Sequence, residues 1–178
     1  MTSTTHSFRD QALPPIELDG DAIRKLLPHR DVMALLDRIQ AYHPVERTIV
    51  AVKRIPMNEF SMQGQTSGRP HFPPTLLTEC LAQASGIMMN MEGLQKLGVD
   101  LRRLPDRTYR TTIPDVPLSV LAESHLKHEF YAEPGETIYL QSRVAMQRGE
   151  FRYFHVRART ESRELADGTI LLSYPTYM

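Results

Sequence analysis

A stretch in the middle of the chain, residues 74–97, constrains the fold more than any other part of the sequence. Pro74 suits the first turn of a helix, because its missing N–H would have no partner there in any case. Little charge lies along the stretch, so such a helix would be buried on most of its sides. Apolar residues recur along it at helical spacing: Leu76, Leu77, Leu81, Ala84, Met88 and Met91. We therefore predict one long, largely buried helix from Pro74 to Leu97.

The residues before this helix predict a short helix and a hairpin. Asp19 or Asp21 can cap a short helix, which Pro28 would end. Two β-rich segments, 35–39 and 47–55, predict a pair of strands with the turn at 42–45.

The residues after the long helix predict a surface segment and a series of strands. The polar segment 98–117 is expected to run over the surface. The expected strands are 119–133, 137–147, 150–160 and 169–174, separated by the turn dipeptides Pro134-Gly135, Arg148-Gly149 and Asp167-Gly168. One buried helix followed by a run of antiparallel strands supports an α+β class.

Length and composition indicate one domain with no obvious charged partner. The chain has 178 residues, enough for one domain with a substantial core. Its 21 basic and 21 acidic residues balance, so charge gives no reason to expect a nucleic acid or an anionic membrane as partner. We expect a flexible N-terminal tail over residues 1–15 and a single domain over 16–178.

Cysteine usage and hydropathy favour a cytoplasmic protein. Cys80 is the single cysteine, which excludes an intrachain disulfide and suits a reducing compartment. No apolar run approaches the roughly 18 residues of a membrane span, and the first residues, MTSTTHSFRDQ, lack the apolar core of a signal peptide.

The segment 58–83, NEFSMQGQTSGRPHFPPTLLTECLAQ, resembles the active-site segment of the 3-hydroxyacyl-acyl carrier protein dehydratases. Aligned without gaps, these positions match the family pattern: Asn58, Glu59, Gly64, Gly68, Pro70, Pro73, Leu76, Glu79, Ala82 and Gln83. Gln65 occupies the position of the family's catalytic histidine. Pro74 replaces a glycine whose amide the family uses to polarise the substrate carbonyl.

Further blocks of the same family pattern follow in the right order. Leu27-Pro28-His29-Arg30, followed by 35–39, is similar to the family's N-terminal signature. Lys127 with Phe130, then Pro134-Gly135-Glu136, is similar to a later stretch. The resemblance covers most of residues 23–174.

The resemblance implies a hotdog fold, a curved antiparallel sheet wrapped around a long central helix. Hotdog subunits pair edge to edge, and each dehydratase site takes a histidine from one subunit and an acid from the other. Glu79 is the acid by position. The resemblance assigns substrate contacts to Gln83, Gly68, Pro70, Phe72 and Pro74. It implies an acyl carrier protein with a phosphopantetheine-linked 3-hydroxyacyl chain as one partner and a second hotdog subunit as another, and neither cofactor nor metal.

The chemistry of dehydration explains why the substitutions matter. Removing the proton beside the thioester carbonyl needs a base that titrates near the working pH, and the amide of Gln65 does not. Donors must face the carbonyl as charge builds, and Pro74 has no N–H to offer. A carboxyl such as Glu79 can protonate the departing hydroxyl. Gln83 follows it by four residues, so the two side chains share a helix face and can form a hydrogen bond.

Three functions follow as alternatives. The first is one half of a heterodimeric dehydratase in fatty-acid or polyketide/polyene biosynthesis, whose partner supplies the histidine. The second is a non-catalytic subunit that stabilises a catalytic partner. The third is a self-sufficient enzyme, either a dehydratase or isomerase with His71 as base, or a thioesterase with Glu79. His29, within the N-terminal signature, is interpreted as structural, and Cys80 as an inert core thiol.

Overall fold

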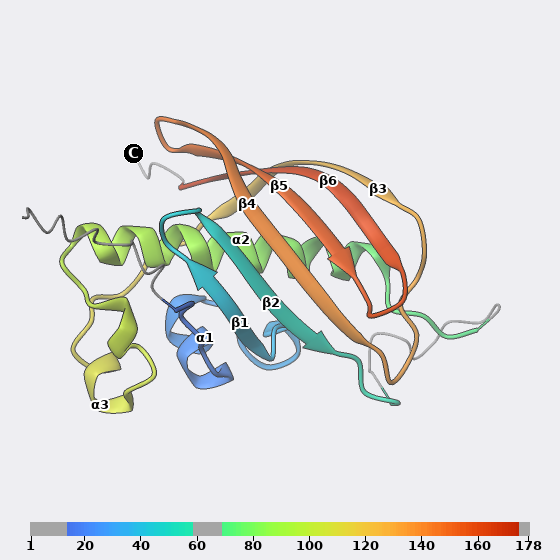
Figure 1. Ribbon diagram of the computed structural model, residues 1–178, viewed down its shortest axis with the longest axis horizontal. Coiled ribbons are helices and arrows are strands. Elements are labelled where there is room, and N and C mark those ends of the chain that lie inside the picture. Colours follow the sequence, from blue (N-terminus) through green and yellow to red (C-terminus); the bar gives the residue numbers. More distant parts are fainter. Residues whose placement is uncertain (1–13, 59–68, 175–178) are drawn as a thin grey trace, which may run out of the picture.

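A six-stranded antiparallel sheet curves around one long helix in the computed structural model, which describes residues 14–58 and 69–174 (Figure 1). The strand order is β1-β2-β4-β5-β6-β3. The strands are β1 (Arg38–His43), β2 (Thr48–Arg54), β3 (Val120–His128), β4 (Thr137–Arg148), β5 (Phe151–Arg159) and β6 (Glu164–Ser173). The helices are α1 (Gly20–Leu26), η1 (Asp31–Met33), α2 (Pro74–Lys96), η3 (Leu101–Arg103) and α3 (Arg107–Arg110). This α+β architecture is the hotdog fold that the resemblance implies.

Helix α2 is the predicted central helix, and its burial accounts for its composition. It begins at Pro74 as expected, and Leu97 is its C-cap. Nearly every side chain from Cys80 to Met91 is buried. A Cβ at Gly86 would lie 2.9 Å from Ser119 Oγ, so glycine permits the close approach of the segment that leads into β3. Cys80 lies buried in the core, as predicted.

The concave face of the sheet supplies the other half of the core. Along β5 the side chains alternate, and Phe154, Val156 and Ala158 face inward with at most 2% of their surface exposed. Alternation of this kind is what a half-buried antiparallel strand requires. Burying a side chain as large as Phe154 contributes about 1.5–3 kcal/mol of transfer free energy.

The predicted turn of the first hairpin was wrong. Tyr42 and His43, expected in the turn, are the last residues of β1 and pair with Ile49 and Thr48 of β2. The residues before α1 explain the difference, because Tyr42 exchanges two backbone hydrogen bonds with Ile16, at 2.9 and 3.0 Å. This pairing extends the strand and covers that edge of the sheet.

The turn predicted at Asp167-Gly168 was also wrong. Both residues lie inside β6, and the connection from β5 falls at residues 160–163 instead. A Cβ at Gly168 would lie 2.1 Å from the backbone oxygen of His125 in β3, so this glycine serves a close approach of two strands. Strand β3 is also shorter than predicted and ends at His128.

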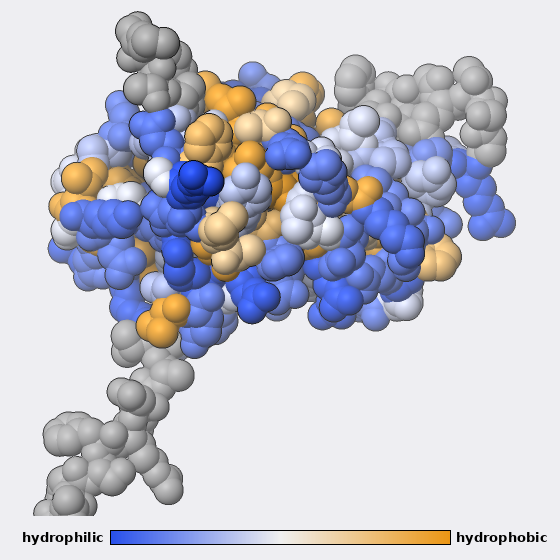
Figure 2. All heavy atoms as spheres, turned by 90° about the horizontal axis from the view of Figure 1, so that it is seen from above, coloured by the Kyte–Doolittle hydropathy of each residue, from blue (hydrophilic) through white to orange (hydrophobic). Residues whose placement is uncertain are grey.

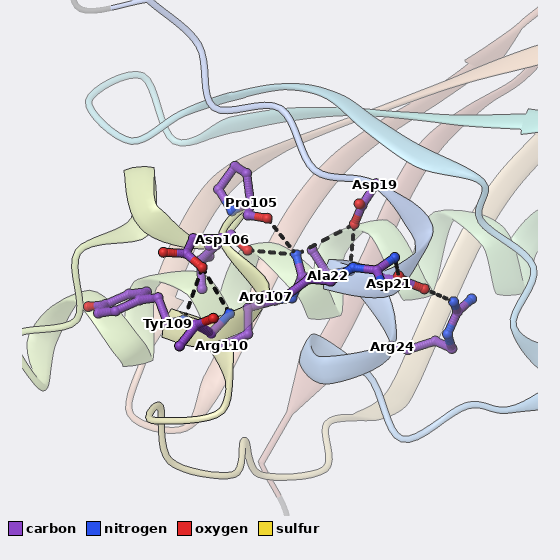
Figure 3. Close-up of polar contacts among 11 residues, drawn as sticks. Asp19, Asp21, Ala22, Arg24, Pro105, Asp106, Arg107, Tyr109 and Arg110 are labelled. Atoms are coloured by element: carbon purple, nitrogen blue, oxygen red, sulfur yellow. Dashed lines mark hydrogen bonds and ion pairs between the residues drawn. The ribbon is translucent and has the colours of Figure 1, made fainter.

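The segment 98–117 is more structured than a surface excursion. It contains η3 and α3, and its residues Leu101, Leu104 and Ile113 are buried. Figure 3 shows Arg107 and Arg110 of this segment facing the acidic residues at the start of α1. The segment therefore packs against α1 and α2 rather than lying free on the surface.

Asp19 and Arg110 join this segment to α1. Asp19 Oδ1 caps α1 by accepting a 2.8 Å hydrogen bond from the Ala22 amide. It also lies 3.6 Å from Arg110 Nη1. The Arg110 guanidinium, almost fully buried, donates to the backbone oxygens of Leu104 and Pro105 at 2.8 and 3.2 Å. Of the two capping candidates in the sequence, Asp19 is therefore the cap.

Of the predicted N-terminal tail, residues 1–13 lie outside the described residues, and the backbone oxygen of Pro14 accepts a 3.1 Å hydrogen bond from Arg102 Nη2. None of the helices in the described ranges combines the length and hydrophobicity that crossing a bilayer would require.

Candidate active site

Glu79 lies in the second turn of α2 with its carboxyl group partly open to solvent. Its side chain is 27% exposed. Gln83, one turn further along the helix, donates a 2.9 Å hydrogen bond from Nε2 to Glu79 Oε1. The four-residue spacing predicted this contact. Glu79 is thus held by a neutral donor and still accessible from outside.

Gln83 is fixed on all sides. It is 2% exposed, and Nε2 also donates to the backbone oxygen of Met33 at 2.8 Å. Its Oε1 accepts from the Leu35 amide at 3.3 Å. Both N–H groups and the carbonyl of this buried amide are therefore in use, as burial demands. The Gln83 side chain ties α2 to η1 and fixes the direction of the N–H that meets Glu79.

His29 is the third member of the group, and the sequence did not predict its position. Its Nε2 lies 3.3 Å from Glu79 Oε1, and its side chain is 28% exposed. Its Nδ1 is buried and has no hydrogen-bond partner among the residues that the structure describes. His29 and Glu79 are far apart in the sequence, so no local spacing reports this contact. The only signal was that both belong to blocks of one family pattern.

His71, the alternative base, lies just before α2. Its ring centroid is 4.2 Å from that of Tyr131, with an interplanar angle of 37°. Its Nδ1 lies 3.2 Å from the backbone oxygen of Arg69. These contacts join the entry of α2 to the segment that follows β3. A catalytic role for His71 stays a prediction.

The other predicted site residues divide into two groups. Phe72 is buried, and its amide donates to the Ala132 oxygen at 2.8 Å, whereas Pro70 is exposed. Gln65 and Gly68 lie outside the described residues. The substrate contacts assigned to these positions and to Gln83 stay predictions.

The start of α2 is poor in backbone donors. Pro73 is the N-cap and Pro74 the first helical residue, and neither has an N–H. The first amide at this helix end is that of Thr75. Neither Pro73 nor Pro74 can therefore donate a backbone hydrogen bond to a substrate carbonyl.

A second cluster of charge lies toward the other end of α2. Arg47 donates to both oxygens of Glu92, from Nε at 2.7 Å and from Nη2 at 2.8 Å. Arg152 donates from Nη1 to Glu92 Oε2 at 2.6 Å. The side chains of Glu92 and Arg152 are 10% and 6% exposed. Such a network is built from charge-assisted hydrogen bonds, which are strong and directional.

Two tyrosines border this second cluster. Burial raises the pKa of Tyr42, and the nearby Glu92 raises it further. The Tyr42 hydroxyl has no hydrogen-bond partner within the described part of the chain. Tyr174 donates from its hydroxyl to Asn90 Oδ1 at 3.0 Å, and burial raises its pKa to about 12. The surroundings of Glu92 thus favour structure rather than exchange with a ligand.

No group of three or more His, Cys, Asp or Glu side chains in residues 14–58 and 69–174 has an arrangement that could hold a metal ion.

Comparison with known proteins identifies relatives by sequence. Residues 27–111 match the model of the FabA-like domain. The 3-hydroxyacyl-[acyl-carrier-protein] dehydratase FabZ of Zymomonas mobilis is 29% identical over 167 residues, which span 94% of this chain and 92% of the relative. The corresponding protein of Koribacter versatilis is 44% identical over 75 residues, 42% of this chain and 47% of the relative. The range 27–111 that matches the FabA-like domain includes the positions of His29, Glu79 and Gln83.

Comparison with solved structures gives the same fold. A chain of the dehydratase heterocomplex ApeI:P from Xenorhabdus doucetiae superimposes with a TM-score of 0.67 and 16% identity, covering 92% of both chains. The PaaI protein of Escherichia coli superimposes with a TM-score of 0.53 and 11% identity over 78% of both chains. At these identities the likeness establishes the fold and leaves chemistry to the residues.

Proposed function

We propose that this chain is one half of a heterodimeric dehydratase, because residues 27–111 match the FabA-like domain and a 3-hydroxyacyl-[acyl-carrier-protein] dehydratase is similar to 94% of the chain. Its substrate is a 3-hydroxyacyl chain on acyl carrier protein. The observation that supports the proposal is that Glu79, the acid according to the resemblance, is held by Gln83 and partly accessible. By the same resemblance, Gln65 takes the place of the family's base.

The division of labour follows from what each residue can do. A base on the partner subunit removes the proton from the carbon beside the thioester carbonyl. Glu79 gives its proton to the 3-hydroxyl group as the carbon–oxygen bond breaks, and water leaves. Two Gln65 side chains in a homodimer would leave this reaction without the family's base, because an amide does not titrate near neutral pH. A histidine-bearing partner restores it.

Strand β3 supports pairing with a second subunit. It lies at one end of the strand order, and most of its side chains are exposed. An open edge strand offers unpaired N–H and C=O groups to another chain. The opposite edge is covered by the residues that pair with β1.

Apolar surface near β3 supports the same pairing. Figure 2 shows apolar side chains gathered on the face seen from above, the side on which β3 and β6 lie in Figure 1. Leu118, two residues before β3, and Val120, its first residue, are each 42% exposed. The likeness to a chain from a dehydratase heterocomplex is consistent with a hotdog partner. We assign the complex to the cytoplasm and to fatty-acid or polyketide/polyene biosynthesis.

A non-catalytic stabilising subunit is the second candidate. The pair Pro73-Pro74 favours it, because the amide that the family uses to polarise the carbonyl is missing at this helix start. In that case the partner supplies a complete site, and this chain contributes the dimer interface.

Native mass spectrometry of the chain, affinity-purified from its own organism under gentle conditions, tests the proposal. We expect a complex with a second protein of dehydratase size. Water loss from a 3-hydroxyacyl carrier-protein substrate is then measured for each chain and for the complex. Activity only in the complex supports a split site. An active homodimer of this chain would contradict the proposal and turn attention to His71.

A further inference from the structure

The segment that carries His29 is fastened to α2 at both of its ends. Before it, the last carbonyl of α1, that of Leu26, accepts a 2.8 Å hydrogen bond from Asn90 Nδ2. After it, the carbonyl of Met33 accepts from Gln83 Nε2 at 2.8 Å. Asn90 and Gln83 are 1% and 2% exposed, so both amides are fixed in the core. Two buried side chains of α2 thus hold residues 27–33 against the helix face that carries Glu79.

Local contacts complete the placement of His29. Arg30 Nη1 donates to the backbone oxygens of Leu27 and His29, at 2.7 and 2.8 Å. Asp31 takes a positive φ of 51°, which turns the chain sharply into η1. A non-glycine residue in this conformation costs free energy, and such residues persist where the surrounding structure demands them. The imidazole is therefore carried by a stiff segment.

The surroundings of the imidazole favour one tautomer. Nδ1 is buried and has no partner in the described ranges, while Nε2 faces Glu79 Oε1 at 3.3 Å. With the hydrogen on Nδ1, the ring would leave a buried N–H unpaired and turn the Nε2 lone pair toward a carboxyl oxygen, whereas with the hydrogen on Nε2 only the Nδ1 acceptor stays unpaired. The hydrogen of a neutral His29 therefore belongs on Nε2, where Glu79 Oε1 can accept it.

Both contacts of Glu79 fall on the same oxygen. Gln83 Nε2 donates to Oε1 at 2.9 Å, and His29 Nε2 lies 3.3 Å from that atom. An oxygen that accepts two N–H groups is the less favourable place for the carboxyl proton. The proton of the acid form then lies on Oε2.

We propose that His29 is a positioning residue for Glu79. As the neutral Nε2–H tautomer it donates to Glu79 Oε1 and, together with Gln83, orients the carboxyl so that Oε2 carries the proton given to the 3-hydroxyl group. In that step the Oε2–H bond and the carbon–oxygen bond of the substrate break, and water leaves. The electron pair left by the proton that the partner's base removes forms the carbon–carbon double bond, and Oε1 and Oε2 share the remaining charge. This inference rests on the proposed function, because it assumes that Glu79 is the acid.

Two substitutions in the complex separate positioning from packing. His29→Leu keeps much of the volume and removes the donor, and we expect kcat to fall by about 10- to 100-fold, the effect of one hydrogen bond to a charged group, with KM nearly unchanged. His29→Gln retains an N–H at a similar reach, and we expect it to restore most of kcat. His155→Leu, at an exposed histidine of β5, is the matched control and should leave kcat unchanged.

The same assay includes Glu79→Gln, so that the two proposals fail differently. Loss of turnover in Glu79→Gln with full activity in His29→Leu would overturn the positioning role alone. Full activity in Glu79→Gln would overturn the proposed function as well. A loss in His29→Leu that His29→Gln does not restore would show packing instead of donation.

A spectroscopic measurement is independent of turnover. Long-range ¹⁵N–¹H correlation spectra of the folded chain, assigned with His29→Gln, report which ring nitrogen carries the hydrogen. In the neutral ring we expect the hydrogen on Nε2. A spectrum with the hydrogen on Nδ1, or one that Glu79→Gln leaves unchanged, would overturn the proposal even if the complex were inactive.

Discussion

Two glutamates of helix α2, Glu92 and Glu79, have very different surroundings. Glu92 is surrounded by the guanidinium groups of Arg47 and Arg152 and has a side chain only 10% exposed. Glu79, in the N-terminal part of the same helix, is 27% exposed and meets an amide and an imidazole. The first carboxylate is held by two guanidinium groups, and the second meets a side-chain amide and an imidazole and remains open to a ligand.

The difference shows which of the two carboxyl groups is the better candidate for catalysis. Removing one partner of a carboxylate that pairs with two arginines strongly destabilises a protein, and such ion pairs occur in structural networks. A carboxyl that is positioned, accessible and not neutralised can take up and release a proton. Burial alone would select Glu92 as the candidate catalytic carboxyl, whereas the groups that donate hydrogen bonds to each carboxyl select Glu79.

The substitution Glu92→Gln should have the largest effect on stability. It keeps the shape of the side chain and removes the charge that compensates Arg47 and the buried Arg152. We expect the free energy of unfolding to fall by about 3–5 kcal/mol. Urea denaturation measures it, with Glu79→Gln as the matched control, expected to change by less than about 1 kcal/mol. Equal losses of unfolding free energy in the two variants would contradict the distinction between a structural Glu92 and an accessible Glu79.

The two arginines should differ from each other in the same experiment. Arg152→Met removes a donor that is 6% exposed, and we expect a loss of about 2 kcal/mol or more. Arg47→Met removes one that is 35% exposed, where solvent weakens the pair, and we expect about 1 kcal/mol. A larger loss for Arg47 would indicate that its two-point contact outweighs burial.

The tyrosines beside Glu92 should report on this cluster at high pH. The pKa of Tyr174 is raised to about 12 and that of Tyr42 is also raised, both chiefly by burial. Each phenol binds its proton more tightly in the folded state than in the unfolded state. The contribution of the protonated phenols to the free energy of unfolding is therefore complete below about pH 10, the pKa of an unfolded tyrosine. This contribution is lost as the pH rises toward 12.

The double substitution of Tyr42 and Tyr174 by Phe should therefore flatten the fall in stability between pH 9 and 11.5, measured by urea denaturation. At pH 7, Tyr174→Phe should cost about 0.5–1.5 kcal/mol for its bond to Asn90. Tyr42→Phe should be nearly neutral, because its hydroxyl has no partner among the described residues. An unchanged alkaline profile would mean that these phenols are not buried in solution.

Local sequence patterns predicted those parts of the molecule that depend on neighbours in the chain. Helix α2 begins at Pro74, and Gln83 contacts Glu79 because four residues make one helical turn. The hotdog architecture came from the family resemblance. The contact between His29 and Glu79 was missed, because only tertiary packing brings those segments together.

The wrong turns have the same origin. Tyr42 belongs to a strand because Ile16 pairs with it, and neither residue signals the other along the sequence. Gly168 was interpreted as a turn glycine, although it allows β6 to approach the backbone of His125. A glycine in a sequence can mark either a close approach of two segments or an unusual backbone conformation, and only the folded structure distinguishes the two.

Turnover of the purified complex on a 3-hydroxyacyl carrier-protein substrate, with Glu79→Gln or Glu92→Gln in this chain, tests the central claim most directly. At a temperature where both variants are folded, we expect Glu79→Gln to lower kcat by about 10²-fold or more, the contribution of a general acid. Glu92→Gln should retain wild-type kcat despite its lower stability. Full turnover in the Glu79→Gln complex would contradict the assignment of Glu79 as the acid.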